Sequence, residues 1–106
     1  MKFHDLSIQE MQQKLLAGEL TSVELTQQCL QRIRATDGQL NAFITICEEE
    51  ALAAAAVADQ QLATGSALSL TGIPIAVKDI FNALDVRTTC GSKILDNYIS
   101  PYDATA

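Results

Sequence analysis

The segment Gly72–Asp79, which reads GIPIAVKD, decides the fold prediction for this chain. Its apolar residues are nearly continuous, which is typical of a strand that is covered on both faces. Pro74 has no backbone N–H to donate, so it belongs near the beginning of a strand or on an edge. The segment ends in Lys78 and Asp79, and ligands of open α/β sheets bind at strand ends. We therefore predict a buried strand that ends in two polar residues at a possible ligand-binding position.

Lys78 is the candidate catalytic residue of this segment. Burial penalises the ammonium form of a lysine, and a neutral amine can then accept a proton as a general base. The alternative is an exposed lysine at the end of the strand that forms an ion pair with Asp79. The residues by themselves leave both possibilities open.

Upstream of this segment, two helix starts are marked by capping boxes. Ser7 and Glu10 form the first box, and Thr21 and Glu24 form the second. In such a box the hydroxyl and the carboxylate each satisfy a free backbone donor. An apolar stripe follows each box, and the first stripe ends at Gly18 and the second at Asp37-Gly38. We therefore predict a helical hairpin over about residues 7–36.

Between the hairpin and Asp79, we predict a strand, a helix and a strand over about residues 41–79. Asn41–Ile46 is rich in β-branched and aromatic residues, which favour a short strand. Glu48–Ala63 has glutamates in its first turn and many alanines, which favour a helix. A loop and a further helix follow over about residues 80–100. The expected architecture is α/β, with helices on a mixed sheet and residues 1–106 in a single domain.

Composition limits the class of function. The 106 residues are 48% hydrophobic, as in a globular domain, and carry a net charge of -6. A nucleic-acid-binding domain usually has a basic surface, so any RNA in the pathway would be held elsewhere. The start of the chain lacks the pattern of a signal or transit peptide, and no apolar run could span a bilayer. We expect a cytoplasmic protein with no membrane partner.

The chain shows no recognisable metal or cofactor motif. Cys29, Cys47 and Cys90 are far apart and form neither a CxxC pair nor a zinc spacing with His4, the single histidine. We expect reduced thiols and no metal site. P-loop, GxGxxG, HExxH and GxSxG patterns are also missing. A Ser-His-Asp triad would have to use His4, close to the terminus, and is not favoured.

Gly72–Asp79 resembles the first conserved block of the amidase-signature family, in which the pattern is Gly-hydrophobic-Pro-hydrophobic-Ala-hydrophobic-Lys-Asp. The match runs over eight consecutive positions. The capped helices, the Asn-Ala-Phe-Ile segment and the alanine-rich helix are similar to the opening of that family, so the resemblance covers essentially the whole chain. In the family, the lysine belongs to a Ser-cisSer-Lys triad and acts through a bridging serine on the nucleophilic serine. The resemblance therefore implies that Lys78 is a general base that relays charge, within the N-terminal portion of the amidase-signature fold.

Within that family, Arg87–Leu95 and Pro101–Thr105 are most similar to the glutamine-hydrolysing subunits of tRNA-dependent amidotransferases. Gly91 departs from them, because those subunits often have alanine there. The resemblance implies release of ammonia from glutamine for transamidation of misacylated glutamyl-tRNA(Gln) or aspartyl-tRNA(Asn). It further implies the B and C subunits of the amidotransferase as partners, tRNA contacted through the B subunit, and ATP and Mg²⁺ used by the complex. No cofactor is expected on this segment itself.

The bridging and nucleophilic serines of the family lie in a block downstream of this region. None of the six serines of this chain matches either role: Ser7, Ser22, Ser66, Ser69, Ser92 and Ser100. We therefore expect the chain to stop before the active site is complete and to be inactive alone. Ser92 falls at a predicted helix start, so we assign it a capping or packing role. A stand-alone amidase and a non-catalytic helical module that binds another subunit remain as alternatives.

Overall fold

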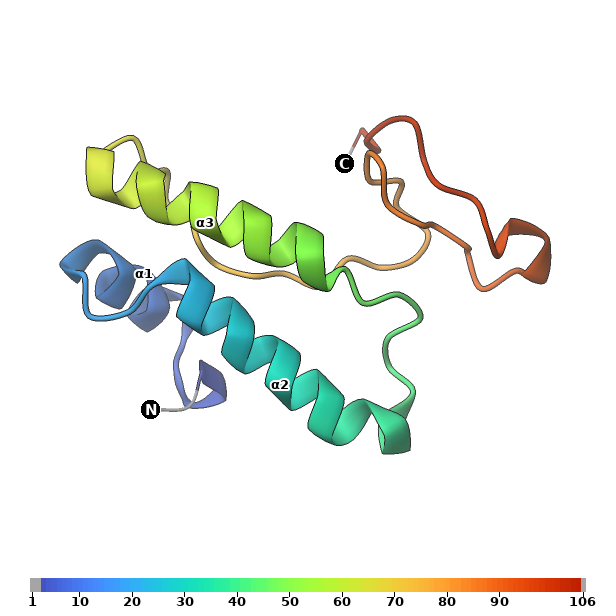
Figure 1. Cartoon of the computed structure of the whole chain (residues 1–106), viewed down its shortest axis with the longest axis horizontal. Helices are drawn as coiled ribbons and strands as arrows, with labels where there is room; N and C mark the ends of the chain where they lie inside the picture. The colour runs from blue at the N-terminus through green and yellow to red at the C-terminus, as the bar shows by residue number, and fades with distance from the viewer. Residues whose placement is uncertain (1–2, 106) are drawn as a thin grey trace. The chain divides into compact units, whose positions relative to one another are not determined.

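The computed structural model describes residues 3–105, so the outer limits of the predicted domain, residues 1 and 106, lie outside the described residues. Helices and loops make up the structure (Figure 1). The elements in chain order are η1 (Phe3–Asp5), α1 (Ile8–Ala17), α2 (Ser22–Leu40), α3 (Glu48–Thr64) and η2 (Lys93–Leu95). The chain divides into two compact units, the first of Met1–Ala42 and Glu48–Pro74 and the second of Phe43–Cys47 and Ile75–Ala106.

Both predicted capping boxes are confirmed in the first unit. The Ser7 hydroxyl accepts a hydrogen bond from the Glu10 N–H at 3.1 Å, and the Ser7 N–H donates to the Glu10 carboxylate at 2.7 Å. Thr21 and Glu24 repeat this arrangement at the start of α2, with distances of 3.1 and 3.2 Å. These bonds satisfy backbone donors that a helix start leaves free, so the local sequence determines where both helices begin.

The second helix continues beyond the predicted end at Asp37-Gly38. Gly38 keeps a helical conformation, and the helix ends at Asn41, which adopts a left-handed conformation with φ of 52°. The N–H of Asn41 donates to the Asp37 carbonyl at 2.7 Å. Asparagine tolerates this conformation better than most residues, so it can replace glycine as the C-terminal cap.

The closely packed helices of the first unit are α2 and α3, which run antiparallel (Figure 1). The carboxylate of Asp59, late in α3, accepts hydrogen bonds from the N–H groups of Ser22 and Val23, at 2.6 and 3.2 Å. At the other end of the pair, Arg34 of α2 forms an ion pair with Glu48 at the start of α3. A carboxylate at a helix N-terminus complements the macrodipole, so α3 helps to stabilise the start of α2.

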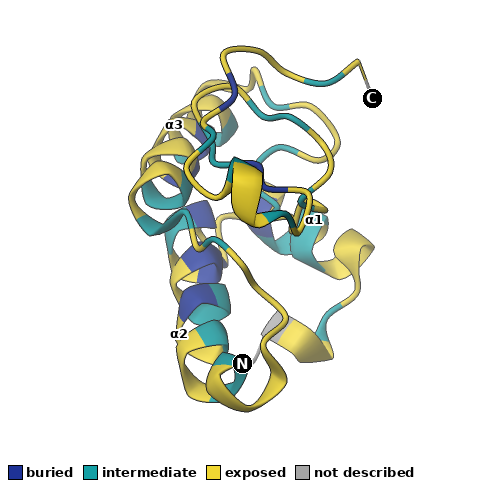
Figure 2. Cartoon of the chain, turned by 90° about the vertical axis from the view of Figure 1, so that its right-hand side faces the viewer, coloured by how far each residue is buried: buried dark blue, intermediate teal, exposed yellow. Residues whose placement is uncertain are grey.

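The apolar core of the first unit gathers where α1, α2 and α3 meet. Leu15, Leu20 and Leu25 are buried, and the side chain of Leu25 has no exposed surface. Figure 2 shows several buried positions along α2 in dark blue. Leu62 of α3 and Ile73 pack against this cluster. Through Ile73, the beginning of the GIPIAVKD segment belongs to the core of the helical unit.

The predicted mixed sheet does not form in residues 3–105, so neither Asn41–Ile46 nor Gly72–Asp79 is a strand. A strand requires a ladder partner, and the only bridge in the described part of the chain is an isolated antiparallel pair, Arg87 and Ile99. Ile75 is 81% exposed and Val77 is 56% exposed, so the predicted cover on both faces is also missing. The helix predicted within residues 80–100 is reduced to the single turn of η2.

Hydrogen bonds between loops organise the second unit. The Thr88 N–H donates to the Tyr98 carbonyl at 3.1 Å, and the Ser100 N–H donates to the Val86 carbonyl at the same distance. Thr88, Thr89 and Ser100 are the buried residues of this unit among those described. Of the helices that the structure describes, none has the length and apolarity needed to cross a membrane.

Candidate active site

Lys78 lies in the second unit, and its side chain is exposed. Its carbonyl accepts a hydrogen bond from the Phe81 N–H at 3.0 Å, which closes a turn directly after the GIPIAVKD segment. Of the two possibilities that the sequence left open, the described chain shows the exposed lysine, because no strand or cover forms around it. The ion pair with Asp79 that went with this possibility is not found, since none of the ion pairs in residues 3–105 joins Lys78 to Asp79.

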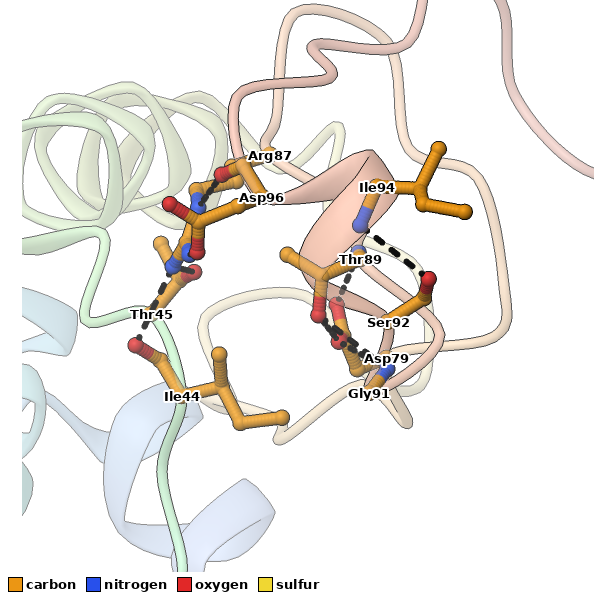
Figure 3. A network of polar contacts seen from close by, with 9 residues as sticks. All are labelled: Ile44, Thr45, Asp79, Arg87, Thr89, Gly91, Ser92, Ile94 and Asp96. Atoms are coloured by element: carbon orange, nitrogen blue, oxygen red, sulfur yellow. Dashed lines mark hydrogen bonds and ion pairs between the residues drawn. The ribbon is translucent and has the colours of Figure 1, made fainter.

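The carboxylate of Asp79 is bonded to a loop ten to twelve residues further along the chain (Figure 3). It accepts hydrogen bonds from the Thr89 N–H at 2.8 Å, from the Thr89 hydroxyl, and from the Gly91 N–H at 3.4 Å. The Asp79 carbonyl accepts a fourth bond from the Cys90 N–H at 3.0 Å. One residue therefore holds three consecutive residues, Thr89–Gly91, which we call the tethered loop.

The hydrogen bonds of the tethered loop lower the pKa of Asp79. The Thr89 hydroxyl has the largest effect, followed by the Thr89 N–H, while desolvation opposes them. The Gly91 N–H and the positive charge of Arg87 add smaller effects that lower the pKa further. Donors that point at a carboxylate stabilise its charged form, so Asp79 is ionised when it holds the loop.

The backbone of the tethered loop bends sharply around Asp79. Cys90 and Gly91 both have left-handed conformations, with φ of 52° and 69°. This conformation costs nothing for glycine but is unfavourable for cysteine, so the surrounding hydrogen bonds have to stabilise it. Ser92 then caps η2 by accepting a hydrogen bond from the Ile94 N–H at 3.3 Å, which confirms its predicted capping role.

A second polar network in the same unit centres on Arg87 (Figure 3). The guanidinium donates to the Thr45 hydroxyl at 3.0 Å and to the Ile44 carbonyl at 3.4 Å. It also forms an ion pair with Asp96 and donates to the Asp96 carbonyl. Arg87 thus joins residues 43–47 to the chain around η2, which explains why these distant segments belong to one unit.

The hydrogen bonds of most serines indicate structural roles. Five of the six use their hydroxyl groups in hydrogen bonds to nearby or packed backbone and side-chain groups: Ser7, Ser22, Ser66, Ser92 and Ser100. The Ser22 hydroxyl, for example, is buried and donates to the Gly72 carbonyl at 2.8 Å. These contacts give none of the five the position of an activated nucleophile.

The histidine and cysteines form no metal site in the described residues. His4 is exposed and lies 3.7 Å from the carboxylate of Asp5. Cys29, Cys47 and Cys90 form no disulfide within the described residues, and burial raises the pKa of Cys29. A raised pKa reduces the thiolate fraction, so Cys29 is not an activated nucleophile.

The sequence predicted Lys78 but missed the groups that organise its surroundings. Asp79 stands next to the candidate base, and three donors converge on its carboxylate from the tethered loop. Arg87 was also missed as the centre of a network. The position of Asp79 within the motif was the available signal, whereas its partners ten to twelve residues away could be found only from the folded chain.

The sequence and the structure of this chain are similar to those of known proteins. The Amidase family model matches residues 24–106. Proteins named as the A subunit of glutamyl-tRNA(Gln) amidotransferase are 54% identical over the whole chain in Geobacter metallireducens, and 56% identical over 96% of it in Thioalkalivibrio sulfidiphilus and in Coxiella burnetii. A solved structure described as "An unexpected vestigial protein complex reveals the evolutionary origins of an s-triazine catabolic enzyme" matches 92% of the chain, with 33% identity and a TM-score of 0.85.

The chain spans only about a fifth of the length of these relatives, 22% of the Geobacter protein and 21% of the other two. It covers 22% of the chain in the solved structure as well. Within that span, the family match includes the GIPIAVKD segment, the tethered loop and η2. The prediction from the sequence is confirmed at this level, and the chain belongs to the amidase family.

Proposed function

We propose that this chain is part of a glutaminase subunit that supplies ammonia for the transamidation of misacylated tRNA in translation. The observation that carries the proposal is the identity above 50%, along essentially the whole chain, to three proteins named as that subunit. The structural relative has lower identity, 33%, over a similar share of the chain. The tRNA-dependent activity is therefore better supported than a related amidase activity.

Lys78 is the general base of this proposed reaction. It occupies the end of the GIPIAVKD segment, and its backbone is held by the turn to Phe81 and by the adjacent Asp79. The Asp79 carboxylate is occupied by the tethered loop, so it does not hold Lys78 in an ion pair in the described structure.

The remaining length of the relatives supplies what this chain lacks. The proposed reaction needs a nucleophilic serine and a bridging serine, and the five serine hydroxyls with hydrogen bonds here are used locally. The remaining length would also provide the strands of an α/β sheet. The exposure of Ile75 and Val77 supports this part of the proposal, because a covered strand would bury both side chains.

The proposed partners follow from the same assignment. The B and C subunits complete a cytoplasmic amidotransferase, the B subunit contacts the misacylated tRNA, and the complex uses ATP and Mg²⁺. The net charge of -6 supports a division of labour in which the RNA is held by another part of the complex. The substrate bound by the proposed catalytic subunit itself is glutamine.

The test uses a full-length protein, in which this chain is continued to the length of its relatives, together with the B and C subunits. Lys78→Ala should reduce glutamine hydrolysis by about two to four orders of magnitude, because a general base is lost. Transamidation with added ammonium salt should continue, because free ammonia bypasses the glutaminase step. Lys93→Ala, at an exposed lysine of η2, is the matched control and should leave both activities unchanged.

Each alternative has its own outcome in this experiment. Hydrolysis of simple amides without partners, unaffected by tRNA, would indicate a stand-alone amidase. Glutamine hydrolysis within tenfold of the unsubstituted protein after Lys78→Ala would reject the catalytic assignment. If only the association with the other subunits then persisted, the chain would be a binding module.

A further inference from the structure

We propose that Asp79 is a positioning residue for Lys78, which acts by tying the tethered loop Thr89–Gly91 to the end of the GIPIAVKD segment. The inference rests on the proposed function, since it assigns a role in the same reaction. Asp79 itself transfers no proton. Its carboxylate accepts hydrogen bonds from the tethered loop and thereby fixes the backbone conformation next to Lys78.

The first argument is how fully Asp79 is used. Both carboxylate oxygens and the carbonyl accept hydrogen bonds, and all the donors lie in Thr89–Gly91. The side chain of Thr89 is buried, at 3% exposure, while Lys78 next to Asp79 is exposed. Bonds to an ionised acceptor are about twice as strong as neutral ones, so these bonds link the lysine segment to the tethered loop more strongly than neutral bonds would.

The second argument is the position of the link. Consecutive Cα atoms are about 3.8 Å apart, so an anchor at Asp79 restrains the backbone of Lys78 directly. The Lys78 carbonyl also accepts a hydrogen bond from the Phe81 N–H at 3.0 Å. The backbone of the lysine is therefore restrained by a local turn and by a long-range tether, while its side chain is exposed and can reach a substrate.

The third argument is that the tether stabilises an unfavourable conformation. Cys90 has a φ of 52°, in the left-handed region that costs energy for a non-glycine residue. The Cys90 N–H donates to the Asp79 carbonyl, and its neighbours on both sides donate to the carboxylate. Without the carboxylate acceptor, the loop would relax toward an ordinary conformation and the anchor beside Lys78 would be lost.

The test compares two pairs of variants in the full-length protein with its partner subunits. Asp79→Asn keeps the shape of the side chain but replaces one acceptor oxygen by a donor amide, which faces donors in the loop. Thr89→Val removes the hydroxyl, which donates to Asp79 and accepts a hydrogen bond from the Gly91 N–H at 3.2 Å, and Thr89→Ser restores both contacts. Asp85→Asn is the matched control, because Asp85 is exposed, lies in the same unit and donates its backbone N–H to the Ser100 carbonyl rather than to the tethered loop.

The readouts are the rate and amplitude of the acyl-enzyme burst, the KM for glutamine, and deuterium exchange of a peptide that covers residues 86–95. Asp79→Asn should slow acylation about ten- to a hundredfold, with burst amplitude and KM nearly unchanged, because the base is misplaced. Exchange in the peptide should become faster. Thr89→Val should show a smaller decrease of the rate, and Thr89→Ser and Asp85→Asn should be close to the unsubstituted protein.

Several outcomes would overturn the inference. Acylation at the normal rate in Asp79→Asn would do so, as would equal rates for Thr89→Val and Thr89→Ser, even if Asp79→Asn failed to fold. A loss of burst amplitude at a normal rate would indicate a purely structural role. Failure of the proposed function is distinguishable, because Lys78→Ala would then remain active, while faster exchange in Asp79→Asn would still report the tether.

Discussion

The two units of this chain are stabilised by different interactions. In the first unit, the buried apolar residues Leu15, Leu20 and Leu25 form a cluster, and capped helices surround it. In the second unit, the buried residues among those described are two threonines and a serine, and many large apolar side chains are exposed. The first unit therefore depends on the hydrophobic effect, whereas hydrogen bonds to Asp79 and Arg87 organise the second.

The unit with the apolar core and the unit with the candidate catalytic lysine are therefore different parts of the chain. In the first unit, residues of the same unit cap the starts of α1 and α2 and form the buried apolar cluster. The unit that carries Lys78 leaves Ile75, Val77 and Ile94 exposed. Its loops are joined by hydrogen bonds that involve Asp79 and Arg87, and its described residues form no apolar core. Substitutions should consequently have their largest effects on stability in the first unit.

The largest expected effect is that of Leu25→Ala. Leu25 has no exposed surface, so truncation leaves a cavity and should lower the free energy of unfolding of the chain by about 2–5 kcal/mol. Ile94→Ala is the matched substitution in the second unit, and because Ile94 is 90% exposed, it should change stability by less than about 0.5 kcal/mol. Urea unfolding monitored by circular dichroism measures both. Equal losses would show that the two units do not differ as described.

The next effect is expected at the beginning of the GIPIAVKD segment. Gly72 has a φ of 89°, and an added Cβ would lie 3.3 Å from side-chain atoms of Leu15, Ser22 and Leu62. Gly72→Ala should therefore cost about 1–3 kcal/mol through strain and overpacking. Gly38→Ala is the control, because Gly38 lies within α2 with open space around it, and alanine should stabilise the helix by about 0.5–1 kcal/mol.

Thermal unfolding of these two glycine variants should give shifts of opposite sign. A destabilising Gly38→Ala would contradict the helical assignment around that residue. A neutral Gly72→Ala would mean that the helical unit does not enclose the start of the lysine segment. Either result would weaken the contrast between the two units.

The smallest effect concerns the pH dependence of the second unit. The pKa of Asp79 is lowered from its ordinary value of 3.8, chiefly by the Thr89 hydroxyl. A depressed folded pKa means that the stabilisation is present above pH 3.8 and is lost as the pH falls through the lower folded value. An NMR titration of the Asp79 carboxyl carbon should therefore have its midpoint below 3.8, and Thr89→Val should move it upward.

Glu10 provides the comparison in the first unit. Its pKa is also lowered, with the hydrogen bond from the Ser7 backbone as the largest cause. Ser7→Ala removes only the hydroxyl and leaves that N–H, so the Glu10 midpoint should move less than that of Asp79 in Thr89→Val. A midpoint for Asp79 at or above 3.8 in the unsubstituted chain would contradict the tether.

The predictability from sequence also differs between the units. Both capping boxes and the three helices of the first unit were predicted, because the signals that begin a helix lie within a few residues of each other. The end of α2 was missed, since Asn41 took the capping role assigned to Asp37-Gly38. The sheet was predicted from the apolar run at Gly72–Asp79, but strand pairing depends on distant segments, and in residues 3–105 no partner lies alongside.

The candidate site was predicted in part for the same reason. Lys78 and the family were identified from a contiguous motif of eight residues. The contacts of Asp79 with Thr89 and Gly91, and those of Arg87 with Thr45, join residues ten to forty-two positions apart. No local pattern marks such pairs, because each depends on how the loops turn. A local motif can therefore suggest the candidate base, whereas the long-range contacts around it are visible only in the folded chain.

The carboxylate of Asp59 has a consequence for the order in which the chain folds during synthesis. Asp59 accepts hydrogen bonds from the first N–H groups of α2, although it lies 37 and 36 residues after Ser22 and Val23. The Gly72 carbonyl accepts a hydrogen bond from the Ser22 hydroxyl, 50 residues earlier in the chain. The first turn of α2 can therefore reach its final state only after Gly72 has been translated. Local capping can begin α2 early, but the hydrogen bonds of its first turn are completed only when the beginning of the GIPIAVKD segment has been synthesised. The helical unit is completed just before the segment that it anchors.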